Sequence, residues 1–239
     1  MKLKDKFDDV KVVKDEVLLK FKDLITGIPC NISVNNQLAL ENTKLVNSYR
    51  EIDPRLRQLV IIVKKWAKSR GVNDAFKQTL SSYAYVLMCI YFLQQHRIPS
   101  NLPCLQEIES KNYKVNLGGD IICEYYNQVD KLENFGCGNR NCESIARLVW
   151  GFFRYWAYCH DYASRVISIR TKNIISKTEK GWNDHYISIE EPFKVSSDLG
   201  KEVDEQTFIV FRKEFERAAF IMEVDSDPLV KLFENKQQW

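Results

Sequence analysis

The sequence predicts an α+β fold that is mostly helical, with a small strand region ahead of a larger helical region. Segment 16–22 is rich in apolar residues and segment 28–34 alternates apolar and polar residues, and the two flank a turn at Thr26-Gly27, which is typical of paired strands. After residue 36, apolar residues recur every three or four positions over several long stretches, which is typical of core-facing helices. A hydrophobic content of 45% in 239 residues is enough for a substantial core.

The helical region is divided by local start and stop signals. Helices are predicted over 37–49, 53–70, 81–95, 142–162 and 204–223, and short strands over 166–170 and 186–189. Asp53 is the expected N-cap of the second helix and Pro54 its first residue, and Gly71 ends it. Ser81 and Ser82 are expected to cap the third helix. Residues 109–141 show no strong pattern and are expected to be irregular.

Two domains follow from these patterns, residues 1–35 and residues 36–239. The first consists of a charged start, Met1–Lys14, followed by the two strands. The most apolar stretch, Tyr83–Leu93, is shorter than the roughly 20 residues that span a bilayer, so no membrane contact is expected. The absence of a signal peptide and the seven unevenly spaced cysteines predict a cytoplasmic protein with reduced thiols.

Net charge and the spacing of cysteines and histidines say little about whether the protein binds nucleic acid or a metal. The formal net charge of +3 is compatible with a nucleic-acid partner but does not require one. Cys137 and Cys142 flank a stretch rich in Gly and Asn and could hold a metal. With three histidines in the whole chain and no second close pair of cysteines, a zinc site is not predicted.

A basic stripe lies on the predicted 53–70 helix, opposite its apolar face. It consists of Arg57, Ile61, Lys64 and Lys68. Lys64 and Lys68 are one turn apart, so their ammonium groups can converge on one anion, as a triphosphate requires. A solvated outer face gives the same spacing, and spacing alone favours that simpler interpretation.

The start of the 81–95 helix is a second candidate site. Unpaired N–H groups at a helix N-terminus suit phosphate, the hydroxyl of Ser82 adds a donor, and Tyr83 offers an aromatic face on which a base can stack. A plain serine cap explains the same residues and is favoured by the local pattern alone. Asn31 and Ser33 share one face of a predicted strand, and their spacing does not decide between a site and an exposed edge.

Five segments together resemble the terminal uridylyltransferase family, which includes cytoplasmic poly(A) polymerase-like enzymes with a polymerase-β-type palm. They are CNISVNNQLALENTKL (30–45), IDPRLRQLVIIVKKWAKSRGV (52–72), TLSSYAYVLMCIYFLQ (79–94), LVWGFFRYWA (148–157) and ISIEEPF (187–193). The resemblance covers about residues 15–226 in order, and it is strongest to plant-type UTP:RNA uridylyltransferases. It implies that residues 1–35 are the remnant of a truncated catalytic palm. It also implies that residues 36–239 are the helical central domain, with a PAP-associated region at about 142–197.

The resemblance implies an RNA 3′-terminal nucleotidyltransferase that binds a nucleoside triphosphate and an RNA 3′ end, and that uses magnesium. UTP is the favoured substrate and ATP a possible one. The residues that match the nucleotide pocket are Asn36, Asn42 and Thr43 near sugar and base, Lys64, Lys68 and Ser82 at the triphosphate, and Tyr83 against the base. The basic stripe and the capped helix were reached from the residues alone, so the two routes agree on Lys64, Lys68, Ser82 and Tyr83.

Two regions depart from the family pattern. Family members hold their metal ions with an Asp-x-Asp pair behind a Gly-Ser turn and with a third Asp, whereas the third position is Asn31 here, which carries no charge. The sequence shows no such turn and pair ahead of it, and its one Asp-x-Asp, Asp225-Ser226-Asp227, follows the last predicted helix. In the base-recognition loop, Glu191 replaces an Asp and Ser197 stands where a His helps to select uracil.

These departures leave three hypotheses. The chain is part of an active transferase whose carboxylates lie elsewhere, a catalytically inactive paralogue that binds RNA or a protein, or a helical scaffold without a nucleotide role. The matched phosphate residues favour the first. The combination of Asn31 and Ser197 favours the second. The retained Lys64, Lys68, Ser82 and Tyr83 argue against the third.

Overall fold

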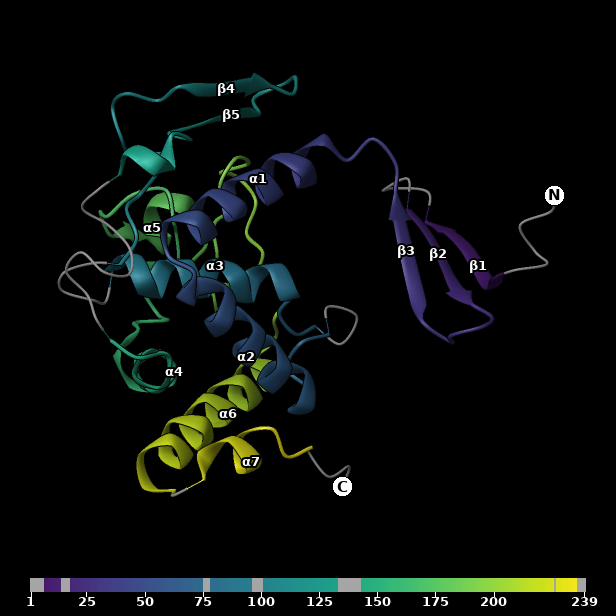
Figure 1. Cartoon of the computed structure of the whole chain (residues 1–239), viewed down its shortest axis with the longest axis vertical. Helices are drawn as coiled ribbons and strands as arrows, with labels where there is room; N and C mark the ends of the chain where they lie inside the picture. The colour runs from purple at the N-terminus through teal and green to yellow at the C-terminus, as the bar shows by residue number, and fades with distance from the viewer. Residues whose placement is uncertain are drawn as a thin grey trace. The chain divides into compact units, whose positions relative to one another are not determined.

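The computed structural model describes residues 7–13, 18–74, 78–95, 101–132, 143–225 and 227–235. The chain forms two compact units, Met1–Thr43 and Lys44–Trp239, which are described separately. Figure 1 shows the strands of the first unit and the helices of the second. Cys137 and Cys142, the pair weighed as metal ligands, lie outside the described residues.

The first unit contains a three-stranded antiparallel sheet with the strand order β1-β2-β3. Its strands are β1 (Phe7–Val13), β2 (Leu18–Asp23) and β3 (Pro29–Ser33). The prediction of two strands after a charged start was wrong, because that start contains β1. Its backbone pairs with β2, and the register shifts between Asp8 and Lys11, which breaks the alternation that would mark a strand in the sequence.

Helix α1 (Gln37–Ile52) crosses from the first unit into the second, where α2 (Arg55–Ser69) and α3 (Ser82–Gln95) follow it. The core of the second unit is aromatic and surrounds Trp66 of α2. Its indole lies edge-on to Tyr85 of α3 at 6.3 Å, to Phe153 at 4.9 Å and to Phe215 at 4.7 Å between ring centroids. Such edge-to-face contacts add to the burial of apolar surface.

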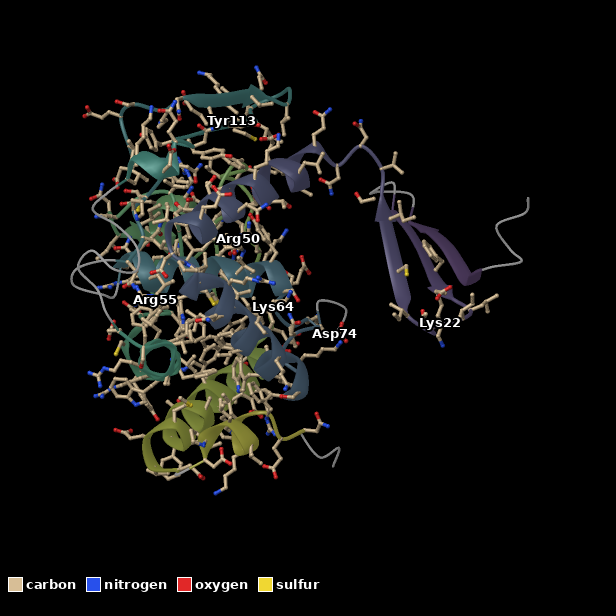
Figure 2. All side chains as sticks on the ribbon, viewed as in Figure 1. Lys22, Arg50, Arg55, Lys64, Asp74 and Tyr113 are labelled. Atoms are coloured by element: carbon tan, nitrogen blue, oxygen red, sulfur yellow. The ribbon has the colours of Figure 1, made fainter. Side chains whose placement is uncertain are left out.

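The start of α2 differs from the prediction, since Pro54 rather than Asp53 is the N-cap. The carboxylate of Asp53 is fully buried and accepts from the Arg55 backbone N–H at 2.9 Å and from its Nη2 at 2.7 Å. A third Arg55 nitrogen, Nη1, donates to the carbonyl of Glu143 at 2.7 Å. Asp53 is therefore used as the partner of a buried guanidinium, which the local sequence could not show. Figure 2 labels Arg55 near the start of α2.

The rest of the second unit is built from shorter elements around two further helices. In chain order they are β4 (Tyr113–Asn116), β5 (Ile122–Tyr125), η3 (Val129–Lys131), α4 (Ile145–Arg154), η4 (Tyr155–Cys159), β6 (Arg165–Val166), β7 (Ile175–Ser176), α5 (Lys177–Lys180), α6 (Glu205–Val224) and α7 (Pro228–Leu232). The β4–β5 hairpin lies in the region expected to be irregular, and α7 follows the helix expected to be the last. In place of the predicted strands 166–170 and 186–189, the structure has the two-residue strand β6 and a single parallel bridge between Ile167 and Ile189.

The helix predicted over 142–162 is two elements, α4 and the π-helical turn η4. Ser144 caps α4 by accepting from the backbone N–H of Arg147. Within the described part of the chain, no helix combines the length and the apolar character needed to cross a membrane.

Candidate nucleotide-binding site

The basic stripe lies on the outer side of α2. Arg57, Lys64 and Lys68 are exposed, as is Ile61, whereas Leu59, Val63, Trp66 and Ala67 of the same helix are buried. Figure 2 labels Lys64 on this helix. An amphipathic helix packed by its apolar side on the core therefore leaves two ammonium groups one turn apart in solvent, free to reach an anion.

The beginning of α3 is tied to the chain that leaves the end of α2. The Ser82 hydroxyl donates to Oδ1 of Asn73 at 3.0 Å, and Asn73 follows Lys68 by five residues. The amide of Asn73 donates to the carbonyl of Leu80 at 3.0 Å, and the Tyr85 hydroxyl donates to the carbonyl of Val72 at 2.7 Å. These bonds hold the N-terminus of α3 beside the C-terminal end of α2, where Lys68 lies.

The start of α3 has the capping geometry that the sequence predicted. The Ser81 hydroxyl oxygen accepts from the Ala84 backbone N–H at 3.2 Å, so Ser81 is the cap and Ser82 is the first helical residue. Because Ser81 caps the helix, the Ser82 hydroxyl takes no part in capping and donates to Asn73 instead. Asn73 is a residue that the sequence reasoning did not select, because a polar side chain after a helix-ending Gly has no distinctive pattern.

Tyr83 meets the recognition loop, defined here as residues 189–197, through Glu191. The Tyr83 hydroxyl donates to Oε1 of Glu191 at 3.4 Å. Burial, with a smaller contribution from Glu191, raises the pKa of Tyr83, so its phenol is protonated and a donor at neutral pH. Because this bond fixes the outer end of the phenol, Tyr83 is held in one place relative to the loop.

Glu191 itself shapes the recognition loop rather than pointing into open solvent. It is buried, and its Oε2 accepts from the backbone N–H of Phe193 at 3.1 Å and of Lys194 at 2.6 Å. Its own N–H donates to the carbonyl of Ser197 at 3.1 Å, and the N–H of Ser197 donates to the carbonyl of Lys194 at 2.8 Å. Glu191 and Ser197 are therefore neighbours within one tight turn.

The adjacent Glu190 is a buried structural carboxylate. Its Oε2 accepts from the Ser168 hydroxyl at 2.6 Å, and its Oε1 pairs with Arg170 at 3.3 Å and with Lys180. Two cations and a hydroxyl compensate for the cost of burying this charge. The recognition loop is thus anchored on its inner side by Glu190 and on its outer side by Glu191.

The three residues that the resemblance matches to sugar and base lie in the first unit, Asn36 just before α1 and Asn42 and Thr43 within it. The side chain of Asn36 accepts from the Ala39 backbone N–H at 3.0 Å, which makes it a cap of this helix. The Thr43 hydroxyl donates to the carbonyl of Ala39 at 2.8 Å. Oδ1 of Asn42 is buried and has no hydrogen-bond partner among the described residues. Of the three, Asn42 retains a free acceptor for a donor outside the described structure.

The position expected for the third metal-binding carboxylate lies within β3, where Asn31 pairs with Lys20 of β2. The side chain of Asn31 is outside the part of the structure that is described. Magnesium needs charged oxygen ligands, and Asn31 offers at most a neutral carbonyl. Among the described residues, no three His, Cys, Asp or Glu side chains are grouped so that they could hold a metal ion. These residues do not fit a magnesium pair.

Comparisons with known proteins match both parts of the chain. Residues 144–197 match the family model of the Cid1 family poly A polymerase, and residues 2–51 match that of the mitochondrial-like poly(A) RNA polymerase central palm domain. The chain is 39% identical over 188 residues to Terminal uridylyltransferase 7 of Homo sapiens, covering 77% of this chain and 12% of that protein. It is 35% identical over 216 residues to Terminal uridylyltransferase cid1 of Schizosaccharomyces pombe, covering 84% and 52%.

Solved structures of Cid1 share the fold over nearly the whole chain. The structure of Cid1 in complex with its short product ApU has a TM-score of 0.87 at 31% identity, covering 98% of this chain and 74% of that chain. The complex of Cid1 with the UTP analog UMPNPP has a TM-score of 0.86 at 31% identity and covers 98% and 75%. The chain spans about half the length of the S. pombe relative and a smaller share of the human one. The α+β, mostly helical fold, the matched segments and these identities show that the chain belongs to the terminal uridylyltransferase and cytoplasmic poly(A) polymerase-like family.

Proposed function

We propose that this chain carries the nucleoside-triphosphate-binding and RNA 3′-end-binding residues of an RNA 3′-terminal nucleotidyltransferase of the uridylyltransferase type. One observation carries the proposal: exposed Lys64 and Lys68 lie on a helix whose C-terminal end is tied, through Asn73, to the hydroxyl of Ser82. Two ammonium groups and a helix N-terminus form a set of donors suited to a polyphosphate, and the Ser82 hydroxyl joins them when it exchanges its bond to Asn73 for one to phosphate.

The remaining residues are assigned by their chemistry and by their match to the family. Tyr83, whose hydroxyl is held by Glu191, presents the ring on which the base stacks. Asn36, Asn42 and Thr43 provide amide and hydroxyl groups for sugar and base. The base preference depends on the recognition loop, which contains Ser197.

UTP is the favoured substrate of this proposal and ATP the alternative. The relatives include both uridylyltransferases and poly(A) RNA polymerases, and the Cid1 neighbours include complexes with a UTP analog and with ATP. A serine hydroxyl at position 197 is shorter than the family's imidazole and cannot fill the same space beside a uracil. We therefore expect UTP to bind more tightly than ATP, but by a smaller ratio than a histidine would give.

Catalysis by this chain alone is not expected, because Asn31 cannot supply the negative charge of the family's third carboxylate. Two-metal phosphoryl transfer depends on such ligands to hold both ions. The coincidence of Asn31 with Ser197 supports a second candidate, an inactive paralogue that binds RNA or a protein partner. The two candidates share nucleotide-site chemistry and differ in whether nucleotides are transferred.

An RNA-extension assay tests the proposed inactivity and, through an Asn31→Asp variant, its cause. The purified chain is incubated with a labelled primer, magnesium and each of the four nucleoside triphosphates, beside an Asn31→Asp variant. We expect no extension by the wild-type chain, and primer extension with UTP would contradict the proposed inactivity. Asn47→Asp, which makes the same change on the exposed side of α1, is the matched control. Extension gained by Asn31→Asp and not by Asn47→Asp would identify residue 31 as a missing ligand and would favour the transferase over the inactive paralogue.

A further inference from the structure

A pocket of about 800 Å³ opens in the second unit, away from every residue assigned to the triphosphate. We call it the donor pocket. Its walls come from the end of η4, the start of α5, the segment before Tyr186 and the first turns of α6. The lining residues that matter here are His160, Tyr162, Lys177, Tyr186, Phe208 and Arg212.

Lys177 is a buried cation with unused donors. Its side chain is part of the wall, yet the residue is only 2% exposed. Nζ donates to the carbonyl of His185. An ammonium group has three N–H donors, and the described residues provide no second acceptor and no ion pair for it. Burial lowers the pKa of Lys177, while Asp198 and Asp161 raise it.

Arg212 of α6 brings a second unpaired donor to the same wall. Its Nη2 donates to the carbonyl of Ala157 at 3.2 Å and approaches Glu216 at 3.5 Å. Its Nε is buried and has no hydrogen-bond partner among the described residues. A buried donor without an acceptor is costly unless a ligand or water supplies one.

His160 adds a buried polar atom to the lining of the same pocket. Its Nδ1 is 3.1 Å from the Tyr155 hydroxyl, and its Nε2 has no partner in the described structure. Burial, with smaller contributions from Arg165, Lys177 and Arg212, lowers the pKa of His160 to about 3, although Asp161 acts to raise it. The imidazole is therefore neutral near pH 7 and able to donate from one nitrogen.

The carboxylates near the pocket are mostly occupied. Asp161 accepts from the Ser164 hydroxyl and from two backbone N–H groups. Asp198 is bonded to His185 at 2.6 Å and to the backbone N–H groups of Ile189 and Gly200. Asp184 is exposed and faces water. Lys177 and Arg212 therefore keep N–H donors that these carboxylates do not occupy, which calls for a ligand rich in acceptors.

Part of the lining is aromatic. Phe208 lies 5.4 Å from Tyr162 and 5.8 Å from Tyr186 between ring centroids, and the Tyr186 and Phe208 rings are tilted by 31°. The Arg212 guanidinium lies 5.1 Å from the centre of the Tyr162 ring. Tyr186 is 39% exposed. An exposed aromatic side chain at the mouth of a pocket is suited to stacking with a nucleobase.

We propose that the donor pocket is a second nucleotide-binding site. The phosphate binds at Lys177 and Arg212, and the base stacks at Tyr186 and Phe208. Phosphate oxygens satisfy the unpaired N–H groups, and the aromatic wall selects phosphate that carries a base over phosphate alone. The ligand is a nucleotide, supplied either by a residue of a single-stranded RNA or by a free mononucleotide. The site does not require the triphosphate-binding residues.

The test uses the full chain and measures binding of a fluorescent 15-nucleotide oligouridylate, UMP and inorganic phosphate. We expect Arg212→Gln and Tyr186→Ala each to weaken oligouridylate binding about tenfold, the loss of one charge-assisted bond or one stacked base. Lys213→Gln removes the same charge from an exposed neighbour on α6 and should leave binding unchanged. Wild-type affinity in both Arg212→Gln and Tyr186→Ala would overturn the proposal.

Two further measurements identify the source of the nucleotide and keep the test decisive if one variant does not fold. UMP binding that is lost in Tyr186→Ala supports a free nucleotide, whereas an effect confined to oligouridylate supports a strand. Tyr186 is exposed, so Tyr186→Ala decides the question if Arg212→Gln fails to fold. UTP binding should persist in Arg212→Gln. If the wild-type chain binds oligouridylate at the donor pocket but does not bind UTP, the proposed triphosphate site fails and this one stands.

Discussion

Replacing Glu214 by Gln is expected to destabilise the second unit more than most single substitutions would. Glu214 of α6 accepts from Arg70 at the end of α2 through two bonds, Nε to Oε2 at 2.8 Å and Nη2 to Oε1 at 3.1 Å. A third Arg70 nitrogen donates to the carbonyl of Glu234 at 2.7 Å. Both side chains are nearly buried, at 10% and 8% exposure. The pair therefore joins the α2 end of the proposed triphosphate site to the C-terminal helices.

The magnitude follows from leaving a buried guanidinium without its counter-charge. Breaking a buried, bidentate ion pair from one side typically destabilises by about 3–5 kcal/mol. A second cation, Arg217, lies nearby: burial and then Arg70 lower its pKa, whereas Glu214 raises it, so loss of the Glu214 charge also removes a favourable interaction with Arg217. In a domain of this size, about 3–5 kcal/mol corresponds to a fall in Tm of roughly 6–20 °C.

Thermal and urea unfolding followed by circular dichroism measure this difference. Glu216→Gln on the same helix is the matched control, because Glu216 is more exposed and its contact with Arg212 is 3.5 Å long. We expect that control to change stability by no more than about 0.5 kcal/mol. A Glu214→Gln variant that unfolds within about 1 kcal/mol of the wild type would refute the reasoning. The double substitution Arg70→Met with Glu214→Leu should recover part of the loss, since it leaves no buried charge.

Three other predictions concern stability. Because His160 has a folded pKa of about 3, below its unfolded value, stability should fall as pH drops below about 6.5, at about 1.4 kcal/mol per pH unit. His160→Gln should flatten acid-unfolding curves between about pH 6 and 4. Gly200→Ala places a Cβ 2.2 Å from the carbonyl oxygen of Ile187, so urea midpoints should show a loss of about 1–3 kcal/mol. Ser81→Ala removes the α3 cap and should lower the free energy of unfolding by about 1 kcal/mol, against no change for exposed Ser196→Ala.

The long helices could be predicted from the sequence because burial on one side sets their periodicity. α2, α3 and α6 lie within a few residues of their predicted bounds. β1 and the β4–β5 hairpin were missed, since their stability comes from backbone pairing between segments rather than from an apolar pattern. The sequence predicts Asp53 as a cap, whereas in the structure it is the partner of buried Arg55. That pairing could not be predicted, because the position of Arg55 also depends on its bond to Glu143, far along the chain.

In the two proposed sites as well, residues that form a local pattern could be predicted and contacts between distant segments could not. Lys64, Lys68, Ser82 and Tyr83 could be selected because each set lies within one turn of a helix. The contact of Tyr83 with Glu191 joins residues 108 positions apart, and no local sequence pattern predicts it. The donor pocket was not predicted at all. Its residues come from the segment after η4, from α5, from the segment before Tyr186 and from α6, and the property that defines it, buried donors without partners, exists only in the folded chain.

Titration of the chain with UTP by calorimetry, in the wild type and in Lys68→Ala, tests the central claim most directly. The matched control is Lys65→Ala, which removes the same charge from the same helix but from a side chain that lies over the Phe233 ring. The account predicts that UTP binds the wild type and Lys65→Ala, and that Lys68→Ala weakens binding by about tenfold. Equal UTP affinity in Lys68→Ala and the wild type, or no binding to either, would contradict it.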